Sequence, residues 1–377
     1  MKNHFPFYFL FVFLICFQSC KKAKEVEAQK IIDQKRIEDS ISLAKKTAEI
    51  APLLDSIILK NKFNAIVSVD WDNKKIYERA NGFSNFKTET KIDNQTLFPI
   101  ASNSKQFAGV LILQLHEQQK LNLDDKVSKY LQDYKTKTYQ DITVAQLLHH
   151  TSGVNFIGER LLFKPGTAMH YSNDGYKSLG DIVENLTGKS YDDNVMALFQ
   201  KLGMTHSSTG NLFNGNNFAS AHLGSLKQNE EVPNMPKRLD KNNISIAAGG
   251  ILSTVDDLHL WNRSLYNGKI LSDSAFQIFV KPAKTFDHYI LGKVKYGCGI
   301  MIHDENPKTY LHTGYVKGAP SLVMYYPKTK TSVVILSNIA NEKLGKKAIY
   351  KSHREIRAKI DSLQMLWTKA ETKSTAG

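Results

Sequence analysis

The sequence predicts an α/β (α+β) fold, in which an antiparallel β-sheet is built from N- and C-terminal segments and flanked by helices, with a mostly helical lobe inserted. Two observations predict it. Residues 101–280 show helical apolar spacing broken by Gly and Asn loops. Short runs rich in β-branched and aromatic residues, typical of strands, stand on either side of that segment. These runs are Phe63–Asp70, Lys74–Ala80, Lys295–Ile302, Pro320–Tyr326 and Thr331–Leu336.

Composition narrows the class of protein. The 377 residues are 42% hydrophobic and 23% charged, which excludes a disordered chain or a coiled coil. Lys and Arg number 50 against 36 Asp and Glu, so the net charge is +14. That balance favours attraction to an acidic surface such as a membrane or a wall polymer. No motif supports nucleic-acid binding, and we expect no nucleic-acid partner.

Residues 1–20 are predicted to be a lipoprotein-type signal peptide. The apolar run Phe5–Phe17 follows a positive start and is too short to span a bilayer, which needs about 20 residues. Soon after this run come Ser19 and Cys20. A small residue before a cysteine at this junction resembles a bacterial lipobox, so Cys20 is the expected lipidation site. An ordinary secretory signal with an incidental cysteine is the alternative. Residues 21–50 are rich in both charges and predict a solvated spacer.

The rest of the chain is expected to form one domain over residues 51–360, followed by a basic tail at 361–377. Cys298 is the one cysteine left after Cys16 departs with the signal and Cys20 is lipidated, so no internal disulfide is expected. No Cys/His cluster has the spacing of a zinc site, and we predict neither a metal nor a cofactor.

The most informative helix is predicted at Ser104–Gln119, because its apolar residues cover nearly the whole circumference and a helix of that kind is buried. At its start stand Ser102 and Lys105, three residues apart and therefore on one helical face. A neutral lysine there can accept the hydroxyl proton, while free N–H groups at a helix start favour an oxyanion. The alternative is an N-cap serine beside a surface lysine.

Two further motifs favour the catalytic interpretation. Tyr171 and Asn173 form the one Tyr-x-Asn of the chain, and His312-Thr313-Gly314 is its one [Lys/His]-Thr-Gly. A tyrosine close to a lysine is a plausible general base, because an ammonium lowers the phenol pKa. Thr-Gly at a strand edge lets the backbone of a substrate approach and add as a strand.

These three elements, in this order, resemble the serine β-lactamase and penicillin-binding protein superfamily, in particular its class C β-lactamase-like branch of D,D-peptidase and esterase relatives. The resemblance covers about residues 51–340. Three further segments agree with it: Asp141–Gly153, Gly188–Tyr191 and Ala247–Thr254. It implies a β-lactamase/transpeptidase-like fold.

The resemblance also implies residue roles. Ser102 would be the acylated nucleophile, and Lys105 and Tyr171 would share the general-base work. Asn173 would position the substrate, and His312, Thr313 and Gly314 would line the opposite strand with Tyr315. The backbone N–H groups of Ser102 and Tyr315 would form the oxyanion hole. Many relatives carry a lysine at position 312; a histidine is mostly neutral at pH 7, which suits peptide, amide or ester substrates better than efficient β-lactam turnover.

We therefore expect a serine acyl hydrolase, most plausibly a peptidase or amidase of the D,D-carboxypeptidase type that acts on envelope peptides. An esterase or a β-lactamase of the same family is the alternative, and a non-catalytic envelope binding lipoprotein is the alternative of another class. The expected location is the membrane surface, facing the periplasm or the cell exterior, through a lipid on Cys20. The expected partners are a small peptide, ester or β-lactam substrate and the membrane.

Overall fold

The structure is a computed structural model that describes residues 7–233, 235 and 237–374. The chain divides into two compact units, Met1–Glu49 and Ile50–Gly377, and the long helix α1 (Phe7–Lys60) belongs to both. Residues 1–6 of the predicted signal peptide, and the side chains as far as residue 26, Cys20 included, lie outside what the structure describes. Among the helices it does describe, none has the length and apolarity needed to cross a membrane.

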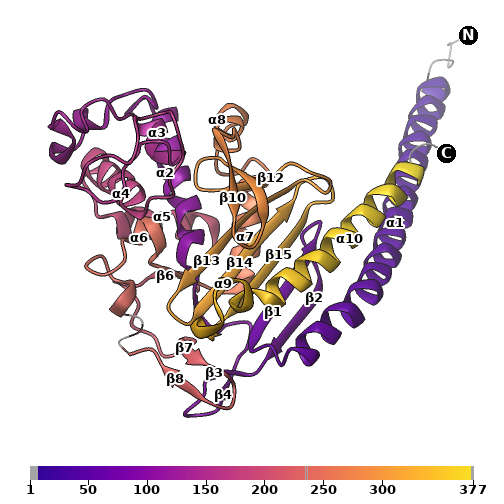
Figure 1. The fold of residues 1–377 in the computed structure, drawn as a ribbon. Coiled ribbons are helices and arrows are strands. Elements are labelled where there is room, and N and C mark those ends of the chain that lie inside the picture. Colours follow the sequence, from indigo (N-terminus) through magenta and orange to yellow (C-terminus); the bar gives the residue numbers. More distant parts are fainter. Residues whose placement is uncertain (1–6, 234, 236, 375–377) are drawn as a thin grey trace, which may run out of the picture. The chain divides into compact units, whose positions relative to one another are not determined.

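The second unit is organised around an antiparallel sheet of eight strands (Figure 1). In sheet order the strands are β10 (Lys284–His288), β11 (Gly292–Tyr296), β12 (Met301–His303), β13 (Thr309–Val316), β14 (Ala319–Tyr326), β15 (Thr331–Ser337), β1 (Ala65–Trp71) and β2 (Lys74–Asn81). The N-terminal hairpin β1–β2 is therefore joined to the C-terminal strands through the β1–β15 pair. This confirms the predicted fold class.

The strands differ from the prediction in two places. The run expected at Lys295–Ile302 is broken, because the backbone turns at residues 297–300 between β11 and β12 and Gly299 adopts a positive φ of 86°. The Cys298 N–H leaves the sheet and donates to Phe279 O at 2.9 Å. Strand β10 was not predicted. Strand β13 was expected around His312-Thr313-Gly314 without bounds, and the structure gives it as Thr309–Val316.

Different helices cover the two faces of the sheet. The register of β14 and β15 places Tyr326 and Ser332 on opposite faces. On one face Tyr326 donates to Asp361 of α10 (Lys351–Ser374) at 2.7 Å. On the other face Ser332 Oγ lies 2.7 Å from His259 Nδ1 of α7 (Val255–Tyr266). The sheet is thus buried between helices, and the β15 side chains are buried along its whole length.

The inserted lobe joins β2 to β10 and is mostly helical, as expected (Figure 1). Its helices are η1 (Ala101–Ser104), α2 (Lys105–Glu117), η2 (Val127–Lys129), η3 (Gln132–Lys135), α3 (Val144–Leu148), α4 (Asn173–Thr187), α5 (Tyr191–Leu202), η4 (Lys237–Leu239), α6 (Ile246–Gly249), α7 and α8 (Asp273–Phe279). Short strands complete it: β3 (Phe83–Asn85) with β4 (Thr90–Lys91), β5 (Phe98–Pro99) and β6 (Ser208–Thr209) on either side of β9 (Ile251–Ser253), and β7 (His222–Gly224) with β8 (Asn229–Glu231). Strand β16 (Ile339–Ala340), which follows β15 outside the lobe, pairs with β7.

Helix α2 lies at the centre of this unit. Ten of its residues are buried, from Lys105 to Leu115, in agreement with the apolar circumference seen in the sequence. It packs against α4, α6 and α8. A Cβ at Gly109 would stand 2.1 Å from Cys298 O, so α2 touches the backbone of the 297–300 turn. The residues at the start of α2 are therefore fixed on several sides.

The C-terminal segment contains η5 (Glu342–Leu344), α9 (Lys346–Ile349) and α10. Helix α10 continues through residue 361, where the sequence predicts the start of a basic tail. The reason is apolar burial, since Leu363 and Trp367 are 5% and 4% exposed. Gln364 also accepts a hydrogen bond from Thr329 in the turn between β14 and β15.

Candidate active site

Ser102 lies on the 3-10 turn η1, just before α2. The preceding residue, Ala101, has a φ of 48°, a left-handed conformation that costs a residue with a Cβ free energy. Buried hydrogen bonds hold the turn in place: Asn103 Nδ2 donates to Ser321 Oγ at 3.0 Å, and Ile251 N donates to Ser104 Oγ at 3.2 Å. A strained turn anchored in this way holds the Ser102 hydroxyl at one position.

Lys105 is fully buried, and its side-chain nitrogen Nζ has three oxygen neighbours. Nζ lies 2.6 Å from Ala248 O, 2.8 Å from Asn173 Oδ1 and 3.4 Å from Ser102 Oγ. Burial holds the pKa of Lys105 well below its usual value, which favours the neutral amine. A neutral amine has two N–H donors and one lone pair. In the neutral form, the two shorter contacts take both N–H donors and leave the lone pair for the Ser102 hydroxyl; in the charged form, all three oxygens accept from the ammonium.

Tyr171 stands beside this lysine, with Lys105 Nζ 4.7 Å from the centre of its ring. Burial raises the pKa of Tyr171, while its hydroxyl contact with Ser102 partly lowers it. Among the described residues no well-aligned hydrogen-bond partner exists for this hydroxyl. We expected an ammonium to lower the phenol pKa; instead, burial raises the pKa of Tyr171 and lowers that of Lys105.

Asn173 is held by the start of α4. The N-cap residue Ser172 accepts a hydrogen bond from Gly175 N at 2.9 Å, and its own N–H donates to His150 Nδ1 at 3.1 Å. The His150 ring lies 4.4 Å from that of Tyr171 and is buried, which holds its pKa well below the usual value. His150 therefore positions the Tyr171–Asn173 segment as a neutral ring.

The strand β13 closes the site from the sheet. A Cβ at Gly314 would lie 2.2 Å from Ile100 O and 2.3 Å from Ser321 Oγ, so only glycine lets β13 approach η1 this closely. His312 projects to the same face and is fully buried. Tyr296 Oη lies 3.0 Å from its Nε2, and burial lowers the pKa of His312 to about 3. Position 312 therefore carries no positive charge at neutral pH.

Thr313 and Tyr315 alternate to the opposite face of β13. Strand β12 pairs with β13 only as far as Leu311, so the edge beyond it is open. Val316 and Ala319 flank a two-residue turn and form a hydrogen-bonded pair, which makes Tyr315 and Pro320 a non-hydrogen-bonded pair. The Tyr315 N–H thus points away from β14, toward the open edge. Pro320 suits this pair, because it has no N–H and none is needed toward Tyr315.

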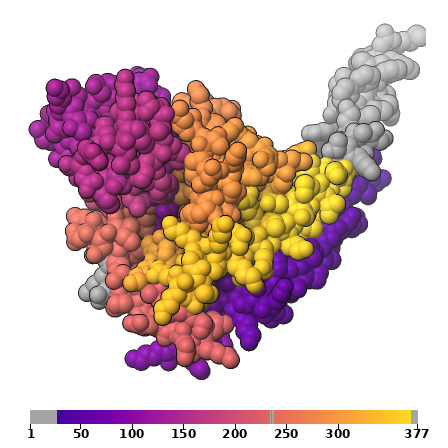
Figure 2. All heavy atoms as spheres, in the orientation of Figure 1, coloured from indigo at the N-terminus to yellow at the C-terminus, as the bar shows by residue number. Residues whose placement is uncertain are grey.

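A cavity of about 390 Å³ connects these groups; it is lined among others by Ser102, Tyr171, Asn173, His312, Thr313 and Tyr315. All eight site residues predicted from the sequence therefore meet at one place, with Lys105 and Gly314 buried beneath the lining. In Figure 2 the magenta helical lobe lies beside the orange region of β10–β12, with the yellow α9 and α10 below. The cavity takes residues from all three regions.

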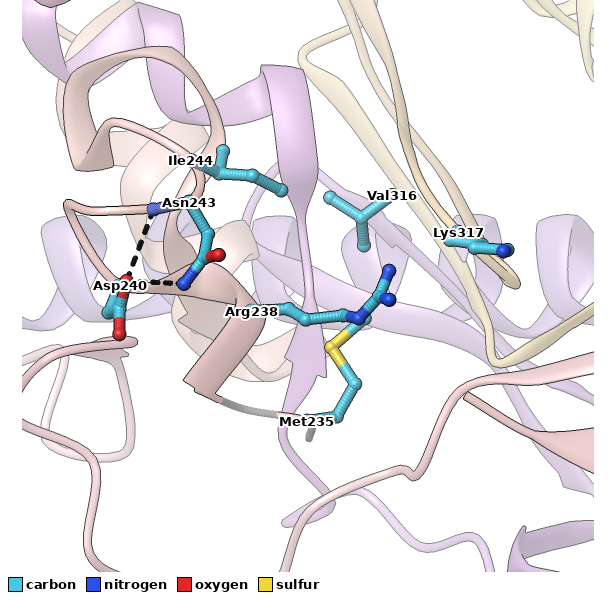
Figure 3. A pocket seen from close by; sticks show the side chains of 7 residues that line it. All are labelled: Met235, Arg238, Asp240, Asn243, Ile244, Val316 and Lys317. Carbon is cyan, nitrogen blue, oxygen red and sulfur yellow. Dashed lines mark hydrogen bonds between the residues drawn. The ribbon is translucent and has the colours of Figure 1, made fainter. Parts of the chain in front are cut away.

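A second cavity, about 580 Å³ in volume, is the larger of the two (Figure 3). It lies beyond the Val316 end of β13 and is lined by Met235, Arg238, Asp240 and Lys317, among others. Asp240 is turned toward Asn243, whose Nδ2 donates to it at 2.8 Å (Figure 3). No nucleophile with an adjacent base faces this cavity among the residues that the structure describes, so the smaller cavity is the candidate active site.

Sequence reasoning missed three contributors. Ala248 supplies only a backbone carbonyl, and no side-chain pattern signals that. Tyr296 and His288 come from β11 and β10; His288 Nε2 lies 3.3 Å from Thr313 Oγ1. For a metal, no cluster of three or more His, Cys, Asp or Glu side chains with suitable placement occurs in the described part of the chain. Cys298 is buried with a pKa raised to about 12 by burial, so its thiol is not a nucleophile.

The chain is similar to known proteins. The sequence profile of the Beta-lactamase family matches residues 63–354. Protein Flp of Staphylococcus aureus is 26% identical over 307 residues, which are 73% of this chain and 59% of that protein. Penicillin-binding protein 4* of Bacillus subtilis is 23% identical over 350 residues, with 82% of this chain and 76% of that one covered. This chain thus spans about three fifths of the length of the first curated relatives it matches.

A solved structure shows the same fold. The penicillin-binding protein homologue from Pyrococcus abyssi superposes with a TM-score of 0.69 at 22% identity, covering 81% of this chain and 76% of that chain. The profile match and this likeness confirm the predicted superfamily. Since the profile spans most of the second unit, the chain belongs to the Beta-lactamase family.

Proposed function

We propose that this chain is a serine acyl hydrolase that forms an acyl-enzyme at Ser102, and that it is a peptidase or amidase of the D,D-carboxypeptidase type. One observation carries the proposal: the buried Lys105 Nζ lies 3.4 Å from Ser102 Oγ and donates to two other acceptors, so its neutral form has a lone pair free for the Ser102 hydroxyl. A protein that only binds a ligand needs no buried neutral lysine beside a serine on a strained turn. The non-catalytic alternative explains neither feature.

Acylation begins with the attack of Ser102 on the substrate carbonyl. Lys105 Nζ takes the Ser102 proton as Oγ forms a bond to the substrate carbonyl carbon. The carbonyl oxygen becomes an oxyanion, for which the N–H of Ser102, at the start of η1, and the N–H of Tyr315, on the open edge of β13, are the donors. The observed 3.4 Å separation of Nζ and Oγ is loose, as is common before substrate binds.

The leaving nitrogen needs a proton when its bond to the acyl carbon breaks. Tyr171 is suited to supply it, because burial keeps its phenol protonated and its hydroxyl has no other well-aligned partner among the described residues. The proton on Lys105 then returns to Tyr171, and the amine leaves. In the second half a water molecule attacks the acyl ester and the Lys105–Tyr171 pair accepts its proton. As the bond between Oγ and the acyl carbon breaks, the pair passes that proton to Ser102 Oγ, which restores the hydroxyl and releases the acid.

The substrate class follows from the charge at position 312. A neutral, buried His312 lacks the fixed cation that relatives with a lysine carry there, which disfavours efficient β-lactam turnover and supports a peptide or amide substrate. An ester is the second candidate, because the same geometry serves any acyl group of moderate size. The open edge of β13 supports an extended peptide, which can pair with it through backbone hydrogen bonds.

The proposed place of action is the envelope. We propose that Cys20 carries a lipid and that the charged residues 21–50 separate the hydrolase domain from the membrane. Metabolic labelling with a fatty acid tests this part by itself. Label on the natural chain that disappears in Cys20→Ser supports it, and label that persists in the variant contradicts it.

The activity is tested with two substrates that share the same acyl group and differ in the leaving group. An N-acylated D-alanyl-D-alanine and the corresponding aryl ester are each given to the protein and to Ser102→Ala, and product release is followed over time. D-Alanine release that depends on Ser102 supports the peptidase. Turnover of the ester alone makes the chain an esterase, and turnover of neither contradicts the hydrolase proposal.

A further inference from the structure

The second cavity has a surplus of positive charge on its wall. Arg238 and Lys317 both line it, and neither forms an ion pair or a hydrogen bond through its side chain within the described part of the chain. Asp240 is the one carboxylate of the described lining. Its Oδ1 accepts from Asn242 N at 3.0 Å and from Asn243 N and Nδ2 at 3.2 and 2.8 Å, so it belongs to its own turn. Two cations and one carboxylate leave a net positive potential in the cavity.

The two cations stand on fixed backbone. Leu239, which follows Arg238 on η4, is fully buried in a hydrophobic cluster. Lys317 belongs to the two-residue turn between β13 and β14, where Gly318 has a φ of 82° and a Cβ would lie 2.7 Å from His222 O. Only glycine fits there, so the turn is held against β7. Figure 3 shows the Arg238 side chain extended from η4 toward the β13 side of the cavity.

The second cavity adjoins the turn that carries Ser102. Gly314 and Val316 alternate onto the same face of β13, and Gly314 contacts η1 there. Val316 lines the cavity and shares a hydrophobic cluster with Ala101, the residue before Ser102. Ile244, also in the lining, packs against the same cluster. The wall of the second cavity is therefore in contact with the segment that holds the proposed nucleophile.

The direction of a bound substrate follows from the order of residues on this face of β13. His312 comes first, and its ring lies 6.2 Å from that of Tyr171, the proposed proton donor to the leaving nitrogen. Gly314 and the η1 turn come next, and Val316 comes last. With the substrate carbonyl carbon at Ser102, the leaving group lies at the Tyr171 end. The acyl part then extends past Val316 toward the second cavity.

We infer that the second cavity binds a carboxylate on the acyl part of the substrate through Arg238 and Lys317. The inference rests on the proposed function and adds the charge of the acyl group: acyl donors that carry a carboxylate remote from the reacting carbonyl are preferred to neutral or cationic ones. The guanidinium of Arg238 can hold a carboxylate through two parallel N–H donors, and Lys317 adds a point charge. Both side chains reach solvent, so each ion pair is moderate and weakens with added salt.

The test uses phenyl esters of N-acyl-D-alanine, which all release phenol and differ only at the far end of the acyl group. The N-acyl group is succinyl, which ends in a carboxylate, succinamoyl, its neutral amide, or γ-aminobutanoyl, which ends in an ammonium. Glutaryl and its amide give a second pair with a longer reach. The kcat/KM of each ester is measured at low salt, so the result does not depend on peptide cleavage.

The variants are Arg238→Gln, Lys317→Gln, the combination of both, and Arg238→Lys. Lys241→Gln is the matched control, because Lys241 lies three residues after Arg238 and lines a different pocket. The readout is the ratio of kcat/KM for a carboxylate ester to that for its amide. Since both substrates are given to the same variant, a partial loss of folded protein cancels from this ratio.

We expect the natural chain to prefer the carboxylate ester in at least one of the two pairs and to use the ammonium ester least well. The ratio should fall about threefold in each single Gln variant and about tenfold in the combined variant. Arg238→Lys should keep most of the ratio, and Lys241→Gln should leave it unchanged. Added salt should lower the ratio of the natural chain.

A natural chain without a preference for the carboxylate in either pair overturns the inference. An unchanged ratio in the combined variant, or an equal fall in Lys241→Gln, overturns it as well. If the expected ratios are found but N-acylated D-alanyl-D-alanine is not cleaved, the peptidase proposal fails and the carboxylate site stands. If all esters are cleaved equally well, the hydrolase stands and the carboxylate site fails; if no ester is cleaved, both fail.

Discussion

Gly314→Ala tests whether the contact between β13 and the Ser102 turn sets the geometry of the site. The added Cβ would lie 2.2 Å from Ile100 O, a distance at which a carbon cannot stand beside a backbone oxygen. Ile100 O also accepts a hydrogen bond from Asn103 N at 3.2 Å, so it cannot turn aside without disturbing the turn. Strand and turn must separate by about 1 Å to restore ordinary contact. Such overpacking costs about 1–3 kcal/mol of unfolding free energy.

The same displacement separates the Tyr315 N–H from Ser102. A misplacement of about 1 Å lowers the rate about 100-fold, and this is the fall in kcat/KM that we expect for ester hydrolysis. Gly175→Ala is the control: a Cβ there would have its nearest neighbour at 3.4 Å, inside helix α4, and should leave the activity within about twofold. Denaturant unfolding and ester kinetics are measured on the natural chain and both variants. Natural activity and stability in Gly314→Ala would refute the reasoning.

Three further changes follow from the site. Lys105→Met removes the base, and we expect acylation by an aryl ester to slow about 1,000-fold. If stopped-flow kinetics showed that the acylation rate falls less than tenfold, another group would have to take the proton. Tyr171→Phe should slow the release of poor leaving groups far more than that of good ones, since only poor leaving groups need the tyrosine proton. The ratio of amide to aryl ester turnover should therefore drop at least tenfold. Equal losses of amide and ester turnover would contradict that role. With its pKa held at about 3, His312 stays neutral when the unfolded chain protonates near pH 6.5, so the folded state loses stability as the pH falls from about 6.5 toward 3. His312→Gln should flatten the pH slope of unfolding free energy between pH 5 and 6.5, and identical slopes would show that His312 does not contribute.

Much of the fold could be predicted because its strands and its central helix carry strong local patterns. Strands β1, β2, β14 and β15 lie within two residues of the predicted runs, since their apolar residues are buried on both faces. The bounds of β13 could not be predicted, because its sequence mixes His312, Thr313 and Gly314 with apolar residues. Those three are required by the site and by the close approach of η1, which local propensity does not describe.

The site was predictable where spacing along the chain carries the chemistry. Ser102 and Lys105 sit three residues apart because one helical turn brings their side chains together. The charge states were not predictable, because they depend on burial from distant segments. Desolvation lowers the pKa of Lys105, and the carbonyl oxygen that accepts from its Nζ belongs to Ala248, 143 residues further along the chain.

Intact-protein mass spectrometry tests the central claim most directly. The natural chain and Ser102→Ala are each treated with a fluorophosphonate and, separately, with a penicillin. We predict one fluorophosphonate adduct on the natural chain and none on Ser102→Ala, with any penicillin adduct long-lived, as expected of a peptidase. A folded natural chain that takes no adduct from either reagent, or an adduct that persists in Ser102→Ala, would contradict an activated nucleophile at Ser102.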